Sequence, residues 1–245
     1  MNPGKVVWGL IGRTHVRFCT AHFSNHHFSL PHAPMKVLAI NGSPREDGNT
    51  AQAIEILLKE LRDEGIETEL VTIGHKTIHG CISCFKCGET KDGRCAAFND
   101  TVNELLPKML EADGIVLGSP VYFSGINGTL KAFLDRAFFV SWFNGGLFRL
   151  KIGASVVAAR RSGGTPSFDQ LNKYFQISEL MTVGSCYWNV IHGFAPGEVH
   201  QDPEGQHTVR TLGRNMAWLL KLIEHGKGHV KPPKPGEPVM TNFVR

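Results

Sequence analysis

The chain has 245 residues, of which 42% are hydrophobic, and this length and content allow one sizeable core in a single domain. The formal net charge of +4 is too small for the dense basic surface of a nucleic-acid-binding protein, although it suits small anionic ligands. The sequence contains no apolar run long enough to predict a membrane-spanning helix.

Residues 1–34 differ in composition from the rest of the chain, because they contain no Asp or Glu but five histidines. Their apolar stretch is too short for a secretory signal, and their helical periodicity is poor for a transit peptide. We interpret them as an N-terminal extension, either disordered or produced by a misassigned start with Met35 as the first residue. A functional arm is the alternative. Without a secretory signal the expected compartment is the cytoplasm, where clustered cysteines more often bind metal or do redox chemistry than form disulfides.

From residue 35 onward, short apolar runs alternate with segments of helical periodicity. The predicted strands cover residues 35–43, 66–73, 114–125, 151–160 and 182–190, and the predicted helices cover residues 50–65, 100–113, 126–139, 168–181 and 205–226. Pro107 should kink the second helix, and an aromatic loop is expected around Trp142 and Phe148. This alternation implies an α/β fold with a doubly wound, five-stranded parallel sheet in a three-layer α/β/α arrangement. Residues 35–225 form one predicted domain, and the Pro-rich tail, residues 226–245, should be extended.

The loop after the first strand, residues 42–50, has the composition of a phosphate site. In a doubly wound sheet, ligands bind at the carboxyl ends of the strands. Small and hydroxyl residues leave backbone N–H groups free at a helix N-terminus, where Ser43, Asn49 and Thr50 could add donors and Arg45 a charge. The loop matches neither the lysine-bearing nucleotide loop nor G-x-G-x-x-G, which disfavours ATP and the usual dinucleotide mode. A plain strand-to-helix turn is the alternative.

Two further loops follow the third and fourth strands. Residues 119–125 present Tyr122 and Phe123 beside backbone amides, which suits one edge of a flat heterocycle, although both rings could instead belong to the core. Residues 160–167 combine glycines that allow close backbone approach with two arginines, which could instead be solvated surface residues.

Residues 81–95 contain four cysteines, Cys81, Cys84, Cys87 and Cys95. Three thiols at two-residue intervals and a fourth beyond them can ligate one iron–sulfur cluster. A zinc site more often pairs two well-separated C-x2-C arms. A loop of free thiols is the third interpretation, and the spacing alone leaves all three open.

Together, the stretches GSPREDGNT, GSPVYFSGINGTLKAFLDR and SGG resemble the flavodoxin-like NAD(P)H-dependent FMN reductases over residues 35–225. The resemblance implies bound FMN and a homodimer or homotetramer with the flavin near a subunit interface. The implied phosphate contacts are Ser43, Arg45, Asn49 and Thr50. The implied ring contacts are Pro120, Val121, Tyr122, Phe123 and Ser124, with Gly163 and Gly164 at the other ring edge. Arg160 or Arg161 could offset charge on the reduced flavin or bind a phosphate of a nicotinamide cofactor.

The cysteine loop resembles that of the iron–sulfur flavoproteins, a branch of the same fold. In that branch such a stretch ligates a [4Fe–4S] cluster beside FMN, which implies Cys81, Cys84, Cys87 and Cys95 as ligands here. Related reductases carry some of these cysteines without a cluster, so free thiols stay an alternative.

The function expected from these features is an FMN-dependent oxidoreductase. NAD(P)H or reduced ferredoxin would be the donor, and a quinone, free flavin, oxygen or a metal ion the acceptor. A flavodoxin-like electron carrier is a second hypothesis, which the mildly basic charge disfavours because such carriers are usually acidic. A third is a flavin dehydrogenase of a biosynthetic metabolite, with the aromatic residues of 140–150 roofing its pocket. The same aromatic residues could instead form a dimer contact.

Overall fold

The computed structural model describes residues 34–237 together with residues 239, 241 and 243. The chain divides into residues 1–33 and residues 34–245. The extension predicted for residues 1–34 therefore lies outside the described residues, apart from Pro34. None of the described helices combines the length and the apolar character that a membrane crossing requires.

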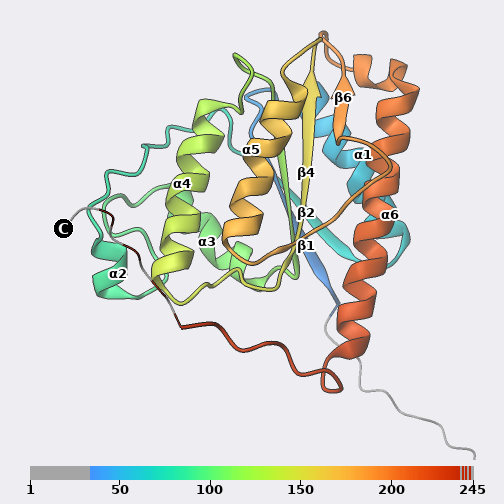
Figure 1. Ribbon diagram of the computed structural model, residues 1–245. Coiled ribbons are helices and arrows are strands. Elements are labelled where there is room, and N and C mark those ends of the chain that lie inside the picture. The colour runs from blue at the N-terminus through green and yellow to red at the C-terminus, as the bar shows by residue number, and fades with distance from the viewer. Residues whose placement is uncertain (1–33, 238, 240, 242, 244–245) are drawn as a thin grey trace, which may run out of the picture. The chain divides into compact units, whose positions relative to one another are not determined.

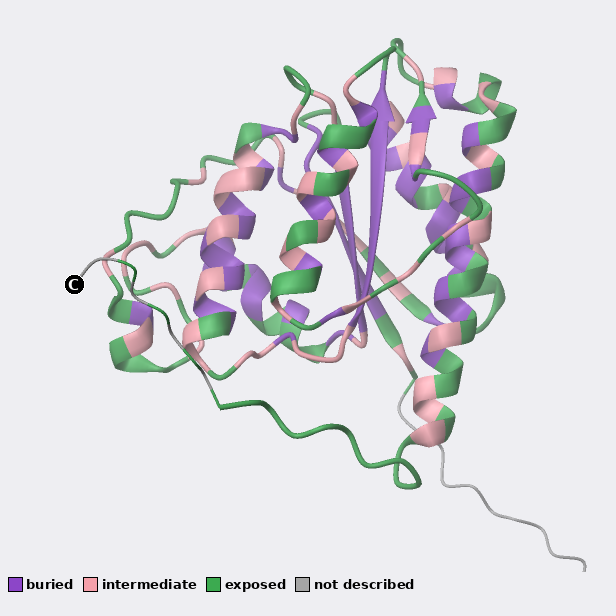
Figure 2. Cartoon of the chain, viewed as in Figure 1, coloured by how far each residue is buried: buried purple, intermediate pink, exposed green. Residues whose placement is uncertain are grey.

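The centre of the fold is a parallel sheet whose strands run in the order β2-β1-β3-β4-β5 (Figure 1). Its four long strands are β1 (Lys36–Asn41), β2 (Glu67–Thr72), β3 (Gly114–Pro120) and β4 (Ile152–Ala159). Every residue of β4 is buried (Figure 2), as its continuous apolar run predicts for a strand covered on both faces. The strand order reverses direction between β1 and β3, and ligands of doubly wound sheets bind at such a switch point. The predicted flavodoxin-like, doubly wound fold is confirmed.

The predicted fifth strand over residues 182–190 is wrong, because the chain pairs with β4 only at the two ends of this segment. β5 (Met181–Thr182) pairs with the start of β4, and β6 (Val190–His192) pairs with its end. Between them the chain leaves the sheet. The Ser185 hydroxyl lies 2.6 Å from Asn189 Oδ1 and 2.7 Å from the Tyr187 carbonyl oxygen, and such local hydrogen bonds compete with strand pairing.

Helices cover both faces of the sheet and complete the three layers (Figure 1). α1 (Asn49–Asp63) and α6 (Pro203–Gly226) pack together on one face. α3 (Thr101–Glu111), α4 (Gly128–Phe143) and α5 (Gly164–Ile177) pack on the other. A short α2 (Lys86–Thr90) lies within the cysteine segment, and a 3₁₀ turn (Glu198–Gln201) precedes α6. The buried side chains of α1 and α6 recur at helical spacing, which gives each helix one apolar face.

All five predicted helices are present with shifted bounds, and α4 and α5 differ most from their predictions. α4 continues to Phe143, so Trp142 is helical and not part of an aromatic loop. The helix ends where Gly145 and Gly146 adopt positive φ angles of 86° and 75°. α5 begins at Gly164, four residues before the predicted start, and ends at Ile177. Pro107 lies inside α3, as expected, and the kink stays a prediction.

The Pro-rich tail follows α6 and contains no helix or strand among its described residues. A turn at residues 227–229 follows α6, and the described trace then runs on away from the helix without further secondary structure (Figure 1). Arg149 Nη1 donates a 2.8 Å hydrogen bond to the carbonyl oxygen of Pro233, which attaches the tail to the loop before β4. Gly226, the first residue of the predicted tail, still belongs to α6, and the extended conformation of residues 226–245 stays a prediction.

Candidate functional site

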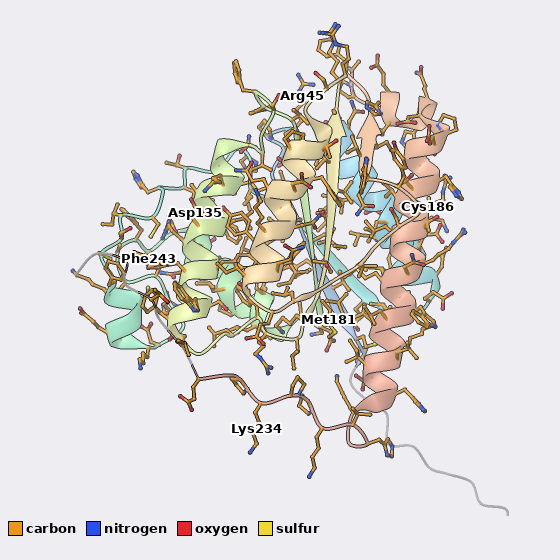
Figure 3. The ribbon with its side chains drawn as sticks, in the orientation of Figure 1. Arg45, Asp135, Met181, Cys186, Lys234 and Phe243 are labelled. Atoms are coloured by element: carbon orange, nitrogen blue, oxygen red, sulfur yellow. The ribbon has the colours of Figure 1, made fainter. Side chains whose placement is uncertain are left out.

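A pocket of about 270 Å³ lies at the carboxyl ends of β1, β3 and β4, next to the switch point. The predicted contacts that line it are Ser43, Arg45, Asn49, Thr50, Pro120, Val121, Tyr122 and Arg160. The predicted contacts that do not line it are Phe123, Ser124, Gly163 and Gly164. Figure 3 shows Arg45 at this end of the sheet. The structure thus brings the first loop, the start of the second loop and Arg160 together around one pocket.

The first loop is shaped by hydrogen bonds from buried groups. The side chain of Asn41, at the end of β1, accepts a 2.9 Å bond from the Ser43 N–H and donates a 3.1 Å bond to Thr72. Ser43 Oγ in turn accepts from the Arg45 N–H at 3.2 Å. The N-cap residue of α1 is Gly48, which provides no side-chain cap. The first N–H groups of α1 therefore adjoin the pocket without a side-chain acceptor, which suits an anion.

The side chain of Asn49, a predicted phosphate contact, forms hydrogen bonds with a distant part of the chain. Its Nδ2 donates to the Ala195 carbonyl oxygen at 2.9 Å, and its Oδ1 accepts from the N–H groups of Gly197 at 3.0 Å and Val199 at 3.4 Å. Both polar atoms of the side chain are thus engaged by the segment that follows β6. This arrangement favours a structural role, in which the Asn49 side chain holds the segment after β6 against the start of α1, over direct contact with a phosphate.

The second loop makes a tight turn at its tip. The N–H groups of Tyr122 and Gly125 each bond to the other residue's carbonyl oxygen, at 2.9 and 3.0 Å. Phe123 and Ser124, between them, have positive φ angles of 48° and 58°, which non-glycine residues adopt at a cost. The Phe123 ring is fully exposed, so a predicted ring contact instead points into solvent. Val121 and Tyr122 stay at the pocket, and the Val121 N–H is fixed by the Ala158 carbonyl oxygen at 3.0 Å.

The loop after β4 packs closely against the loop after β3. Gly163 has a φ of 87°, and a Cβ there would lie 2.8 Å from Val121 Cγ1 and 2.9 Å from Ser124 Cα. Only glycine allows this approach. The guanidinium of Arg160 lies 5.2 Å from the centre of the Phe194 ring, a cation–π contact at the wall of the pocket.

A second pocket, of about 450 Å³, opens at the outer edge of the sheet between the N-termini of α5 and α6. Gly163, Gly164 and Arg161 line it, together with Tyr187 and Trp188 from the segment that leaves the sheet. On its other side Asp202 accepts hydrogen bonds from the backbone N–H groups of His192 and Gly205. Burial raises the pKa of Asp202, but these bonds and the neighbouring His192 ring outweigh burial and hold it below its ordinary value.

Sequence reasoning missed the segment that follows β6. Gly193 and Phe194 line the first pocket, and the bonds from Asn49 fasten the residues after them. These contacts join residues about 150 positions apart, so no local motif reports them. The available signal was the Gly-Phe-Ala-Pro-Gly stretch of residues 193–197, a loop composition directly after the last predicted strand.

The four cysteines of residues 81–95 line one further cavity. Its lining residues are Cys81, Ile82, Cys84, Phe85, Cys87, Cys95, Ala96, Ala97, Phe98, Arg136, Phe139 and Val140. The volume is about 20 Å³, so a larger group would require the loop, in which Cys81 and Phe85 are exposed, to move outward. Ser83, Phe85 and Lys91 all have positive φ angles, and such strain often gathers at ligand sites.

The donor chemistry of this cavity fits an iron–sulfur cluster. Burial raises the pKa of Cys87, and the adjacent Cys95 and Cys84 raise it further, so the thiols lie close enough to interact. Among the described residues, no three His, Cys, Asp or Glu side chains converge closely enough to hold a single metal ion. A cluster attaches each thiolate to a different iron, so its ligands are spaced more widely than those of one zinc ion.

Cys95 is held from two sides. The buried Asn103 accepts from the Cys95 N–H at 2.7 Å and donates to its carbonyl oxygen at 3.0 Å. Arg136, whose exposed fraction is 1%, points Nε at the Cys95 sulfur, 3.3 Å away, and pairs with Asp100 at 2.6 Å. Burial alone would lower the pKa of Arg136, but the bonds to Asp100 and Cys95 raise it overall. Sequence reasoning did not single out this arginine.

The fifth described cysteine lies elsewhere. Cys186 is exposed on the segment between β5 and β6, with its sulfur 3.9 Å from the Thr208 hydroxyl of α6 (Figure 3). It therefore takes no part in the cavity of residues 81–95.

Comparison with known proteins agrees with this geometry. Residues 35–195 match the family described as NADPH-dependent FMN reductase. An iron–sulfur flavoprotein of Methanocaldococcus jannaschii is 40% identical over 197 residues, which cover 78% of this chain and all of the relative. An iron–sulfur flavoprotein of Methanosarcina thermophila is 28% identical, with 79% and 99% covered.

Solved structures show the same fold at low identity. An NAD(P)H:quinone oxidoreductase from Methanothermobacter marburgensis superposes with a TM-score of 0.55 at 16% identity, covering 75% of this chain and 96% of its own. An archaeal flavodoxin superposes with a TM-score of 0.50 at 14% identity, with 76% and 99% covered. The family match covers more than half of the chain, and the relative at 40% identity matches over its whole length. The chain therefore belongs to the NADPH-dependent FMN reductase family, in its iron–sulfur flavoprotein branch.

Proposed function

We propose that the chain transfers electrons from NAD(P)H or reduced ferredoxin, by way of bound FMN, to a small acceptor such as a quinone, a free flavin or oxygen. Membership of the family makes it an NAD(P)H-dependent flavin oxidoreductase. The observation that carries the proposal is the pocket at the switch point, where the uncapped start of α1 meets the loops after β3 and β4.

The lining residues divide into a phosphate end and a ring end. Ser43, Thr50 and the first N–H groups of α1 would hold the phosphate, and Arg45 would balance its charge. The segment Pro120–Tyr122 would lie along the ring, with Arg160 at its polar edge. FMN supplies the hydride and single-electron chemistry when bound, so the residues of this chain need only bind it, orient it and set its electrostatic surroundings.

We propose further that Cys81, Cys84, Cys87 and Cys95 hold a [4Fe–4S] cluster, which exchanges single electrons when bound. The four thiols line one cavity, and several relatives are named iron–sulfur flavoproteins. Thiolate ligation of this kind fits a reducing compartment, so a cytoplasmic location is part of the proposal.

A homodimer or homotetramer also belongs to the proposal. Phe85 and Trp142, both more than half exposed, lie in the aromatic group beside the cysteine loop and would be covered in an assembly. Neither a nucleic acid nor a membrane is among the proposed partners.

The test is a spectrum of anaerobically purified protein before and after addition of NADPH. We expect flavin absorbance that NADPH bleaches, and tighter binding of FMN than of riboflavin, which lacks the phosphate. Protein that binds neither flavin, or that binds both equally, would contradict the proposed pocket. Bound flavin that NADPH reduces without turnover of any acceptor would favour the electron carrier.

Iron analysis tests the cluster separately. We expect about four irons per chain, as all-cysteine ligation of a [4Fe–4S] cluster requires. Cys84→Ala should lose them, whereas Cys186→Ala, at an exposed thiol outside the cavity, should retain them. Absence of iron from the anaerobic wild-type protein would leave a flavin reductase with free thiols.

A further inference from the structure

Arg136 is a buried cation that the flavin pocket does not use. It lies on α4 with an exposed fraction of 1%, although a buried charge is costly unless it is paired. Its Nε points at the Cys95 sulfur, 3.3 Å away, its Nη1 bonds to Asp100 at 2.6 Å, and the Phe98 ring covers it at 4.9 Å. This cation is therefore directed at one thiol of the cysteine cavity.

The partners of Arg136 are themselves held in place. One oxygen of Asp100 pairs with Arg136, and the other caps α3 by accepting from the Val102 N–H at 3.1 Å. Asn103 clamps the backbone of Cys95 through both its N–H and its carbonyl group. The sulfur and the guanidinium consequently face each other from rigid supports, although the chain separates them by 41 residues.

The charge of Arg136 bears on any electron that enters a cluster held by Cys95. Each added electron makes a thiolate-ligated cluster more negative, and hydrogen bonds to ligand sulfurs and nearby charge set its reduction potential. A buried cation is screened far less than an exposed one. We propose that Arg136 is a positioning residue that orients the Cys95 sulfur and raises the reduction potential of the cluster, while Asp100 partly offsets it. The inference rests on the proposed cluster.

The two members of the pair allow opposite perturbations. Arg136→Met removes a positive charge and should lower the potential. Asp100→Asn removes a negative charge while keeping a good helix cap, and should raise it. We expect about a tenfold change in the one-electron reduction equilibrium in each direction, which corresponds to about 59 mV. The double variant should lie close to the wild type. Lys131→Met, which removes a partly exposed cation that is paired with Asp135 on the same helix, is the matched control and should leave the potential unchanged.

The measurement is a spectroscopic redox titration of iron-loaded protein, with iron content determined for each variant. A wild type without iron would refute the proposed cluster and the inference that rests on it, whereas a failure confined to iron-loaded protein would refute the inference alone. In loaded protein, an unchanged potential in Asp100→Asn, or shifts of both single variants in the same direction, would overturn the inference. Asp100→Asn decides the matter even if Arg136→Met loses iron. A purely structural ion pair would lower stability without producing opposite shifts.

Discussion

Replacing Asn49 with alanine should release the segment after β6 from α1. The side chain makes three hydrogen bonds to this segment, through the carbonyl oxygen of Ala195 and the N–H groups of Gly197 and Val199. The segment begins with Gly193 and Phe194, which line the proposed flavin pocket. The substitution should therefore lower both the stability of the chain and its affinity for FMN.

The size of the effect follows from the exposure of these bonds. They are exposed or part-buried, so each contributes toward the lower end of the usual range, and together they amount to about 2 kcal/mol. For a chain of this size, about 2 kcal/mol corresponds to a Tm lower by about 4–8 °C.

Urea unfolding of flavin-free protein measures the first effect, and FMN titration measures the second. Lys59→Ala is the control, because Lys59 lies on the exposed side of the same helix in a solvated pair with Asp63. It should change the free energy of unfolding by no more than about 0.5 kcal/mol. If Asn49→Ala unfolds like this control and yet binds FMN weakly, Asn49 contacts the phosphate directly and the reasoning is refuted.

Gly74→Ala should weaken FMN binding and lower the free energy of unfolding by about 1–3 kcal/mol, because its Cβ would overlap the backbone of residues 42–44. Gly80→Ala, with open space around its Cβ, should change neither quantity, and equal behaviour of the two variants in urea unfolding would show that the close approach is unimportant. Asp202→Asn should flatten the acid side of the stability profile. The pKa of Asp202 is lowered in the fold by hydrogen bonds that include the His192 N–H, so its contribution is complete above the ordinary Asp pKa of about 3.9 and disappears as pH falls through the lower folded pKa. Urea unfolding between pH 6 and about pH 3 should show a wild-type advantage that shrinks below about pH 4, and parallel profiles would contradict this.

The sheet could be predicted where apolar runs are continuous. β1, β3 and β4 are buried on both faces, and such runs identify central strands. The segment from residue 182 to 190 has equally strong strand formers, including Tyr187 and Trp188. This segment leaves the sheet where a local hydrogen bond between Ser185 and Asn189 competes with strand pairing, and the apolar pattern does not encode that bond. The end of α4 could have been predicted from the sequence, because Gly145 and Gly146 are better signals of a helix C-terminus than the aromatic residues before them.

The site was predictable where one loop carries its own chemistry. Ser43 and Arg45 belong to such a loop and line the pocket. Arg136 was not predicted as a site residue, because a charged residue in a helix usually faces solvent. Leu134 and Ala137, which are close to it on the same helix, are buried as well. Asn49 was assigned to a phosphate because its loop suggested one, whereas the partners that engage it come from the other end of the chain. Long-range partners decide such roles, and no local spacing encodes them.

The two short strands beside β4, β5 and β6, also affect how copies of this chain can associate. A continuous, uncharged edge strand invites another chain to extend the sheet, which is a common route to aggregation. Here one edge consists of strands of two and three residues, and the other, β2, exposes Glu67 and Glu69. Neither edge offers a good template for polymerisation through backbone pairing. We therefore expect the proposed assembly to form through helices and loops, where side chains select the partner.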